Sequence, residues 1–274
     1  MNTEFSVLMS VYRNDNPEHF VQAVESIGHS QDLQPTEILL VVDGPVEEQL
    51  RTAIEHCEDV NDNLNVVWLP KNVGLGNALR EGLLHTHCEI VARMDSDDVA
   101  NPSRFKQQIA YLLNNPTISI VGGQISEFID SLENTVGNRV VPLDDMELKS
   151  YSKARCPFNH MTVMFRKQDV LAAGNYMHWH FNEDYYLWIR MAEAGYKFAN
   201  LPDVLVNVRV GKDMYARRGG WKYFKSEKGL QDYMLQHNMI SLPRYIYNTL
   251  GRFVVQVAMP NRLRGFIFQK LFRK

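Results

Sequence analysis

The chain has 274 residues, of which 45% are hydrophobic and 22% charged, and its formal net charge at pH 7 is -3. This composition predicts one large core, alone or with a small appendage, and excludes a largely disordered chain. A net charge so close to zero also excludes a protein-wide basic field, so no nucleic-acid partner is expected.

The cysteines and the lack of long apolar runs limit the cellular compartments in which the protein is expected. Cys57, Cys88 and Cys156 are odd in number and have no metal-ligand spacing, which disfavours a disulfide framework and a structural zinc site and fits a reducing compartment. The first five residues do not resemble a signal peptide, and no window approaches the roughly 20 apolar residues that span a bilayer. We expect a cytoplasmic protein that meets a membrane only at its surface.

In the first hundred residues, short apolar runs rich in β-branched residues alternate with segments of helical period. The runs predict strands at 5–11, 37–42, 64–69 and 89–94, and the segments between them predict helices at 16–28, 46–57 and 74–85. This alternation is typical of βαβ units with a parallel sheet.

The rhythm changes after Pro102, where a helix to about residue 113 is followed by three strand-like segments separated by Gly and Asn. We expect strands at 118–121, 124–129, 136–141 and 161–165, and helices at 144–154 and from 182 or 183 to 194. This half predicts mixed or antiparallel sheet.

The last 34 residues differ in composition from the body. Residues 241–274 contain no acidic residue and interleave aromatic side chains with seven basic ones: Arg244, Arg252, Arg262, Arg264, Lys270, Arg273 and Lys274. This pattern predicts one or two amphipathic helices on an anionic membrane surface. The alternative is a C-terminal helix that docks on the core or on a second subunit.

The strongest local motif is Met94-Asp95-Ser96-Asp97-Asp98, which places three carboxylates at the end of a buried strand. Ligands bind at the ends of strands in open α/β sheets. Clustered carboxylates repel one another, and their hard oxygen atoms favour Mg²⁺ or Mn²⁺, which could bridge a diphosphate. The alternative is a solvated acidic turn that caps the helix after Pro102.

Two glycine-containing loops follow earlier strands. Asp43-Gly44 suits contact with the imide of a uracil or, equally, a tight turn. The loop from Lys71 to Asn77 contains Gly74 and Gly76, suits anion or ribose contact, and matches neither a Walker A motif nor a dinucleotide fingerprint.

Asn182-Glu183-Asp184 opens an amphipathic helix and places two carboxylates in its first turn. They either cap the helix or supply a general base, and the helix N-terminus is expected to keep the base ionised.

In chain order, five motifs resemble glycosyltransferase family 2 with a GT-A fold over about residues 5–212: Val11-Tyr12-Arg13-Asn14, Val42-Asp43-Gly44, Asn72-x-Gly74-Leu75, Met94-Asp95-Ser96-Asp97-Asp98, and Glu183-Asp184-Tyr185-x-Leu187-Trp188. The resemblance implies an α/β fold with a Rossmann-like mixed sheet flanked by helices. It divides the chain into a catalytic domain at 1–212, with a nucleotide-binding half to about residue 100 and an acceptor-binding half from 101. A basic appendage at 213–274, with a flexible loop and amphipathic helices, would follow.

Within the family, Cys156-Pro157-Phe158-Asn159-His160 resembles bacterial enzymes of exopolysaccharide, capsule and O-antigen assembly. The implied reaction is inverting transfer of a hexose or N-acetylhexosamine from a UDP-sugar to a glycan acceptor carried on polyprenyl diphosphate. The implied location is the inner face of the cytoplasmic membrane.

The resemblance also assigns site residues. For the donor, it implies Tyr12 and Asp43 at the nucleobase, Asn72, Gly74 and Leu75 near the nucleoside, and Asp95 and Ser96 near the ribose or donor sugar. For the chemistry, it implies that Asp97 and Asp95 hold Mn²⁺ or Mg²⁺ and that Asp184 is the base, with Glu183 as second choice. It also implies His160 in the donor or acceptor cleft, and Arg217 and Arg218 over the diphosphate. His160 could instead be a structural residue, and the two arginines a solvated loop.

Two other functions use similar parts. A sugar nucleotidyltransferase also combines a nucleotide-binding half with a carboxylate-held metal, but it needs a Gly-rich N-terminal loop, and residues 10–17 contain no glycine. A non-catalytic, membrane-associated protein that binds nucleotide sugars would share every binding motif, and only a turnover assay separates it from an enzyme.

Overall fold

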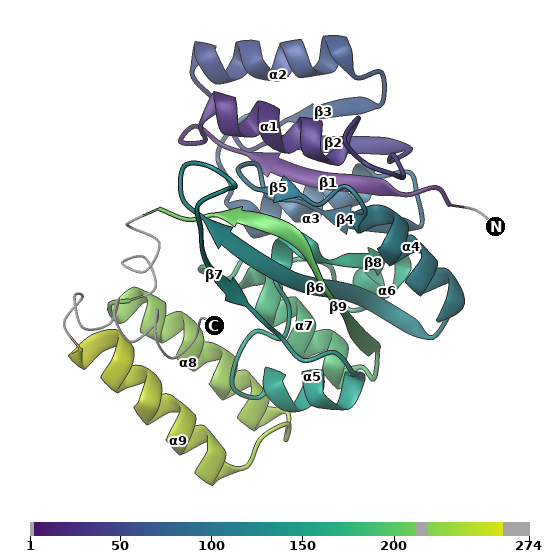
Figure 1. Ribbon diagram of the computed structural model, residues 1–274. Coiled ribbons are helices and arrows are strands. Elements are labelled where there is room, and N and C mark those ends of the chain that lie inside the picture. The colour runs from purple at the N-terminus through teal and green to yellow at the C-terminus, as the bar shows by residue number, and fades with distance from the viewer. Residues whose placement is uncertain (1–2, 212–218, 260–274) are drawn as a thin grey trace.

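The computed structural model describes residues 3–211 and 219–259. A twisted sheet runs through the molecule, and helices cover both of its faces (Figure 1). Its strands follow the order β3-β2-β1-β4-β8-β6-β9-β5, with β7 paired to the free part of β6. The α/β class and the mixed sheet predicted from the sequence are confirmed.

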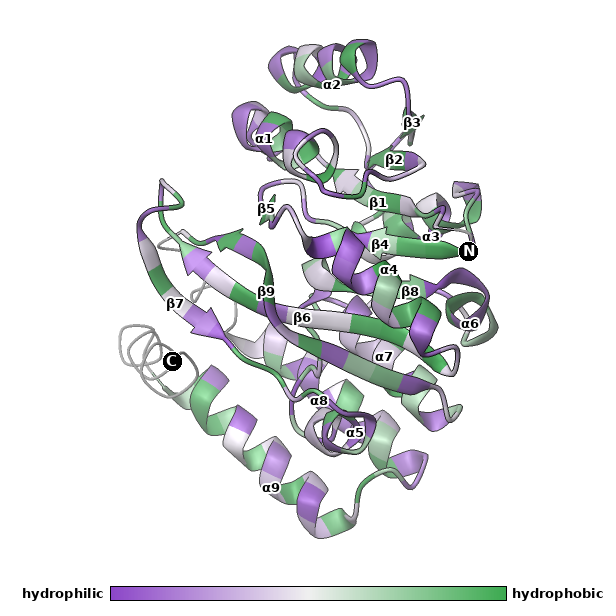
Figure 2. Cartoon of the chain, turned by 45° about the vertical axis from the view of Figure 1, so that its right-hand side comes forward, coloured by the Kyte–Doolittle hydropathy of each residue, from purple (hydrophilic) through white to green (hydrophobic). Residues whose placement is uncertain are grey.

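The first half is parallel, as predicted. Its elements are β1 (Ser6–Val11), α1 (Pro17–Ile27), β2 (Glu37–Val42), α2 (Glu48–Val60), β3 (Leu64–Trp68), α3 (Leu75–His85) and β4 (Ile90–Arg93). Strands β3, β2, β1 and β4 all point the same way, so their carboxyl ends lie at one edge of the sheet. The central strands are predominantly apolar (Figure 2), because both of their faces are buried.

The second half mixes parallel and antiparallel pairing. Its elements are β5 (Val99–Ala100), α4 (Arg104–Asn114), β6 (Ile118–Phe128), β7 (Thr135–Arg139), α5 (Asp145–Ser152), a short 3₁₀ turn (His160–Thr162), β8 (Met164–Arg166), α6 (Lys167–Ala172), α7 (Glu183–Glu193), β9 (Lys197–Arg209), α8 (Trp221–Gln236) and α9 (Leu242–Phe253).

The two strands expected at 118–121 and 124–129 form one strand, β6, so that expectation was wrong. The strand continues through Gly122 and Gly123, where β9 leaves no room for a side chain. A Cβ on Gly122 would lie 2.3 Å from Asn200 Oδ1, and a Cβ on Gly123 would lie 2.4 Å from Leu205 Cδ1. These glycines therefore mark a close approach of β9 rather than a turn.

Strand β9 was not predicted, and its middle contains Pro202-Asp203, a pair typical of a turn. In the structure Gly122 pairs with Asn200 and Gln124 with Val204, so a bulge on β9 accommodates the proline. The strand predicted at 161–165 begins only at Met164, after the 3₁₀ turn.

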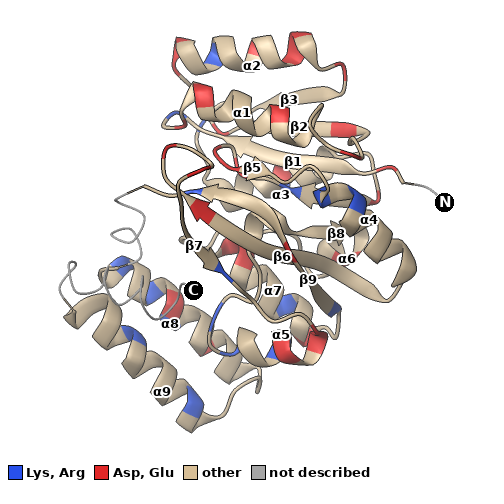
Figure 3. Ribbon diagram, viewed as in Figure 1, with Lys and Arg blue, Asp and Glu red and all other residues tan. Residues whose placement is uncertain are grey.

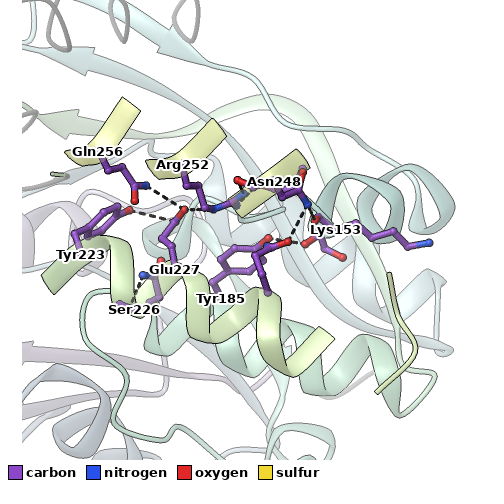
Figure 4. A network of polar contacts seen from close by, with 12 residues as sticks. Lys153, Tyr185, Tyr223, Ser226, Glu227, Asn248, Arg252 and Gln256 are labelled. Atoms are coloured by element: carbon purple, nitrogen blue, oxygen red, sulfur yellow. Dashed lines mark hydrogen bonds and ion pairs between the residues drawn. The ribbon is translucent and has the colours of Figure 1, made fainter. Parts of the chain in front are cut away.

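Helix α8 packs on α7, and α9 packs on α8. Leu230 and Met234 of α8 bury apolar surface with Tyr185 and Ile189 of α7. Figure 4 shows the polar contacts that fix α9: Asn248 donates to the Lys153 carbonyl at 2.9 Å, and Arg252 bonds Glu227 Oε2 at 2.5 Å and the Ala154 carbonyl at 2.6 Å. The first turns of the basic tail thus dock on the core.

No helix in the two described ranges is both long and apolar enough to cross a membrane. The tail residues Arg262, Arg264, Lys270, Arg273 and Lys274 lie outside the described residues, so the predicted amphipathic helix beyond α9 has no structural description.

The packing of α3 on the sheet yields a test. A Cβ on Gly82 would lie 2.5 Å from Leu8 Cδ1 and 2.6 Å from Val41 Cγ2, so we expect Gly82→Ala to destabilise the fold by about 1–3 kcal/mol. Gly251→Ala in α9 is the control, because no atom of the described residues lies within 4 Å of the added carbon and a helix gains about 0.5–1 kcal/mol from the change. Urea unfolding of both variants measures the difference, and equal stabilities would contradict this packing.

Candidate active site

The carboxyl ends of β1, β2 and β4 bring three predicted motifs to one edge of the sheet. Figure 3 shows acidic stretches, in red, in the loops beside β5 and on α7. Parallel pairing places Tyr12, Asp43 and the acidic motif after Arg93 at neighbouring strand ends. This edge is where open α/β sheets bind ligands.

The Asp43 carboxylate ties down the neighbouring loop. It accepts hydrogen bonds from the backbone N–H of Val73 at 2.7 Å and of Gly74 at 3.0 Å, and from Asn72 Nδ2 at 2.9 Å. Gly44 has φ +89°, and a Cβ there would lie 2.4 Å from the Asn72 backbone nitrogen. The Asp43-Gly44 turn therefore fixes the start of α3, and Asn72 and Gly74 lie beside Asp43, with Leu75 next along the chain.

The motif after β4 divides into three different environments. Asp95 forms an ion pair with Arg93, whereas Asp98 is buried and accepts from the Arg209 backbone N–H at 2.9 Å. Asp97 has an exposed outer edge. Nothing in the motif caps α4, whose first turn receives no side-chain cap, so the capping alternative gains no support.

Like charges crowd this edge. Desolvation and repulsion from Asp95 and Asp15 raise the pKa of Asp97 to about 6. Desolvation first and Asp97 second raise the pKa of Asp98 well above its usual range. The site therefore carries negative charge that a bound cation would relieve.

Asp15 is a carboxylate that sequence reasoning missed. Its Oδ2 accepts from Ser96 Oγ at 2.9 Å and from the Tyr12 backbone N–H at 3.1 Å. Burial raises its pKa to about 6, with Asp95 adding to the rise. Asp15 thus joins Tyr12 and Ser96, two of the predicted residues, to the acidic motif. Its position four residues after a strand gave no signal on its own.

The first turn of α7 faces the same site. A Cβ on Gly76 would lie 2.9 Å from Glu183 Cβ, so the start of α3 packs directly against Glu183. Asp184 Oδ2 accepts from the Cys156 thiol at 3.5 Å, and burial keeps the pKa of that thiol well above its usual range. Cys156 belongs to the motif that ends at His160, but its contact with Asp184 was not predicted from the sequence.

Burial outweighs the helix dipole at both carboxylates. Desolvation, followed by repulsion from Asp184, raises the pKa of Glu183 to about 7. Desolvation also raises the pKa of Asp184, although the Tyr185 backbone N–H opposes it. Loss of water therefore opposes ionisation of both carboxylates, and the expectation that the helix N-terminus keeps the base ionised stays a prediction.

His160 lies near Arg93 and is a neutral imidazole. Burial and the nearby positive charge of Arg93 hold its pKa well below the usual range. Its Nε2 is 3.0 Å from the Tyr176 hydroxyl, whose own pKa is raised by burial. This partner favours the structural interpretation of His160, while its position beside Arg93 keeps it at the site.

Arg93 is the second residue that sequence reasoning missed, and it links these groups. It is 2% exposed at the end of β4, and its charge lowers the pKa values of Asp97, Asp98, Glu183 and Asp184 against the effect of burial. An arginine inside an apolar strand is a usable signal, since arginine is almost never fully buried unless it is paired.

The structure therefore brings the acidic motif, Glu183 and Asp184 together around Arg93, and joins Asp43 to them through the loop that carries Gly74 and Gly76. Arg217 and Arg218 lie outside the described residues. A cavity of about 330 Å³ opens beside Asp43, lined by Gly44, Pro45, Val46, Arg51, Trp68, Leu69 and Pro70.

The carboxylate oxygens of Asp97 and Asp95 fit a cation that is also bound by the phosphates of a ligand. Among the described residues, no three His, Cys, Asp or Glu side chains gather closely enough to hold a metal by themselves. Asp97 faces outward with a raised pKa, and Asp95 has one oxygen on Arg93. Mg²⁺ is usually held by one or two carboxylates together with substrate phosphates, and these two residues match that pattern.

Comparison with known proteins gives consistent matches. Residues 6–172 match the family described as "Glycosyl transferase family 2". The chain is 39% identical to the amylovoran biosynthesis glycosyltransferase AmsE of Erwinia amylovora, over 97% of this chain and 98% of that protein. It is 34% identical to an Escherichia coli UDP-Gal:alpha-D-GlcNAc-diphosphoundecaprenol beta-1,3-galactosyltransferase, over 99% of this chain and 97% of that protein.

A solved structure matches the fold. The mannosyltransferase PcManGT of Pyrobaculum calidifontis, in complex with GDP-Man and Mn2+, superposes with a TM-score of 0.65 at 17% identity, over 95% of this chain and 71% of that one. The GT-A fold implied by the sequence motifs is confirmed.

The raised pKa of Glu183 predicts a pH-dependent stability. Because the pKa rises from 4.5 to about 7 on folding, the contribution of this group is fully present below pH 4.5 and is lost as the pH rises through 7. In EDTA, Glu183→Gln should therefore raise the Tm at pH 8 by about 2–4 °C and leave it unchanged at pH 4.5.

The control for this experiment is Glu193→Gln in the same helix. Hydrogen bonds from Tyr233 and then His237 lower the pKa of Glu193, so its loss should lower the Tm at pH 8. A Glu183→Gln variant no more stable than wild type at pH 8 would contradict the raised pKa of Glu183.

Proposed function

The chain belongs to glycosyl transferase family 2, and from this premise we propose that it transfers a hexose or N-acetylhexosamine from a UDP-sugar to a lipid-linked glycan, with inversion at the anomeric carbon. We further propose that the product serves bacterial surface polysaccharide assembly. The observation that carries the proposal is the gathering of Asp97, Glu183 and Asp184 around one buried arginine at the ligand-binding edge of the sheet.

The donor nucleotide would bind across the ends of β1 and β2. Tyr12 is 37% exposed and is free to stack on a base. The Asp43 carboxylate accepts three hydrogen bonds from the neighbouring loop before α3. A carboxylate has about four acceptor positions, so one more donor, such as a uracil imide, could still bind. The name of the Escherichia coli relative, which includes UDP-Gal, also supports UDP.

Asp97 and Asp95 would hold Mn²⁺ or Mg²⁺, and the bound cation would stabilise the negative charge of the leaving diphosphate. The mannosyltransferase structure, a complex with GDP-Man and Mn2+, supports this assignment. Asp98 takes no part in it, because its carboxylate is committed to the backbone of Arg209.

Asp184 would take the proton from the acceptor hydroxyl. The hydroxyl oxygen then forms the new bond to the anomeric carbon while the bond from that carbon to the diphosphate oxygen breaks, and UDP leaves with the electron pair. A single displacement inverts the anomer. Burial raises the pKa of Asp184 and so makes it a stronger base. Glu183 is the second choice, since its pKa of about 7 also suits a general base.

The acceptor is proposed to be a glycan on polyprenyl diphosphate, as in the name of the Escherichia coli relative. Such an acceptor lies at a membrane surface, and α9 presents a suitable face. Asn248 and Arg252 bond to side chains of α8, while α9 exposes the apolar residues Leu242, Ile246, Tyr247 and Leu250. We propose that this face rests on the inner leaflet of the cytoplasmic membrane.

The base assignment is tested by Asp184→Asn. This variant keeps the size of the side chain but cannot accept the proton, so transfer from a UDP-sugar should fall by about 10²–10⁴-fold, while the Kd for UDP stays within twofold by calorimetry. Glu183→Gln is assayed in parallel. Near-normal turnover by Asp184→Asn, with a larger loss in Glu183→Gln, would move the base to Glu183.

The same assay carries the control for the cation. Excess EDTA should abolish transfer by the wild type, and added Mn²⁺ should restore it. Full activity in chelator would reject the role given to Asp97.

The membrane face is tested by the double variant Ile246→Ser, Leu250→Ser. Removing two apolar side chains from the contact should weaken sedimentation with phosphatidylglycerol vesicles by at least about tenfold. Leu84→Ser is the control, because Leu84 is 56% exposed on α3 and lies outside α9. Unchanged vesicle binding by the double variant would reject the contact and leave the transfer chemistry untouched.

A further inference from the structure

Arg93 is a fully buried cation whose hydrogen-bonding capacity is only partly used. It is 2% exposed, and its single ion pair among the described residues is with Asp95, two positions further along the chain. Its Nε has no hydrogen-bond partner within the described part of the chain. A buried donor without an acceptor costs stability, so packing alone does not account for an arginine at this position.

The surroundings of Arg93 are uniformly acidic on one side. Its charge acts on Asp95, Asp97 and Asp98 after β4 and on Glu183 and Asp184 in α7. The guanidinium is charged because arginine stays protonated in proteins, and its ion pair with Asp95 offsets part of the cost of burying that charge.

A second buried arginine lies beneath it with a different role. Arg104 donates to the Arg93 backbone carbonyl at 2.6 Å and to Gln108 Oε1 at 3.1 Å. Burial and then Arg93 lower the pKa of Arg104 to about 9. Arg104 thus fixes the backbone at the end of β4, which leaves the side chain of Arg93 as the cation that meets the carboxylates.

We propose that Arg93 is a positioning residue for sugar transfer, which orients the Asp95 carboxylate through their ion pair and acts as the resident counter-charge of the acidic site. A planar guanidinium holds a carboxylate in a defined orientation, whereas an ammonium does so less well. The inference rests on the proposed function for its catalytic consequence, but the ion pair itself can be tested without any assay of transfer.

The catalytic arm compares Arg93→Lys with wild type. Lysine keeps the charge but not the fork, so Asp95 should lose its orientation, and kcat should fall by about tenfold or more while the KM for the donor changes less than threefold. The matched control is Arg166→Met. Within the described ranges, Arg166 donates hydrogen bonds to the backbone carbonyls of Ile118 and Leu112 and to no other group. It lies at the end of β8 opposite Ile90, the first residue of β4, and so away from the site, so this variant should lose stability and keep its kcat.

The stability arm is a double-mutant cycle measured by thermal unfolding in EDTA. Arg93→Met should lower the Tm by about 5–10 °C, because it leaves the Asp95 carboxylate without its partner. Adding Asp95→Asn should recover part of that loss, which a simple packing defect would not do. Added Mn²⁺ should raise the Tm of Arg93→Met more than that of wild type, since the metal then replaces the missing cation.

The two arms separate the possible failures. A Lys variant with wild-type kcat, or an Asp95→Asn change that recovers none of the lost Tm, would overturn the role of Arg93. A wild-type protein that transfers no sugar from any UDP-sugar would overturn the proposed function, while the stability cycle would still report on the pair.

Discussion

The site depends on one electrostatic constraint, which is that carboxylates from three distant parts of the chain gather at the same sheet edge. Desolvation raises the pKa values of Asp15, Asp97, Asp98, Glu183 and Asp184, and repulsion from neighbouring carboxylates adds to the rise at all of them except Asp184. Such an assembly can form only if positive charge and hydrogen-bond donors are built in beside it. The fold supplies them through a buried arginine, the backbone of β9 and the thiol of Cys156.

Direct contacts fix the loop before α3 and the first turn of α7 relative to each other. The Asp43 carboxylate fixes the loop before α3, and the absence of a side chain at Gly76 lets the start of α3 touch Glu183. The start of α3 and the first turn of α7 are therefore in direct contact, although more than a hundred residues separate them. Prior fixing of this kind is what a transferase needs to place a donor sugar and a base within reach of each other.

Helix α7 connects the chemistry to the C-terminal helices. Its first turn carries Glu183 and Asp184, and its next residues, Tyr185 and Ile189, pack against α8. Helix α9 then lies on α8, with Arg252 bonded to Glu227 and its apolar face turned outward. The surface proposed to meet the membrane and the helix proposed to carry the base thus belong to one packed unit, so the height of the site above a membrane would be set by side-chain packing.

The sequence by itself determined the parallel first half, the mixed second half, and the placement of Tyr12, Asp43 and the Asp95–Asp98 motif at strand ends, because periodicity and turn residues are local properties and parallel strands end at one edge. It could not determine that Asp98 binds the backbone of Arg209, that Cys156 contacts Asp184, that Arg93 pairs with Asp95 at the centre of the carboxylates, or that β9 passes Pro202 in a bulge. Each of these depends on strand register, or on burial by segments far away in the chain, and the balance of desolvation against charge exists only once those segments have packed.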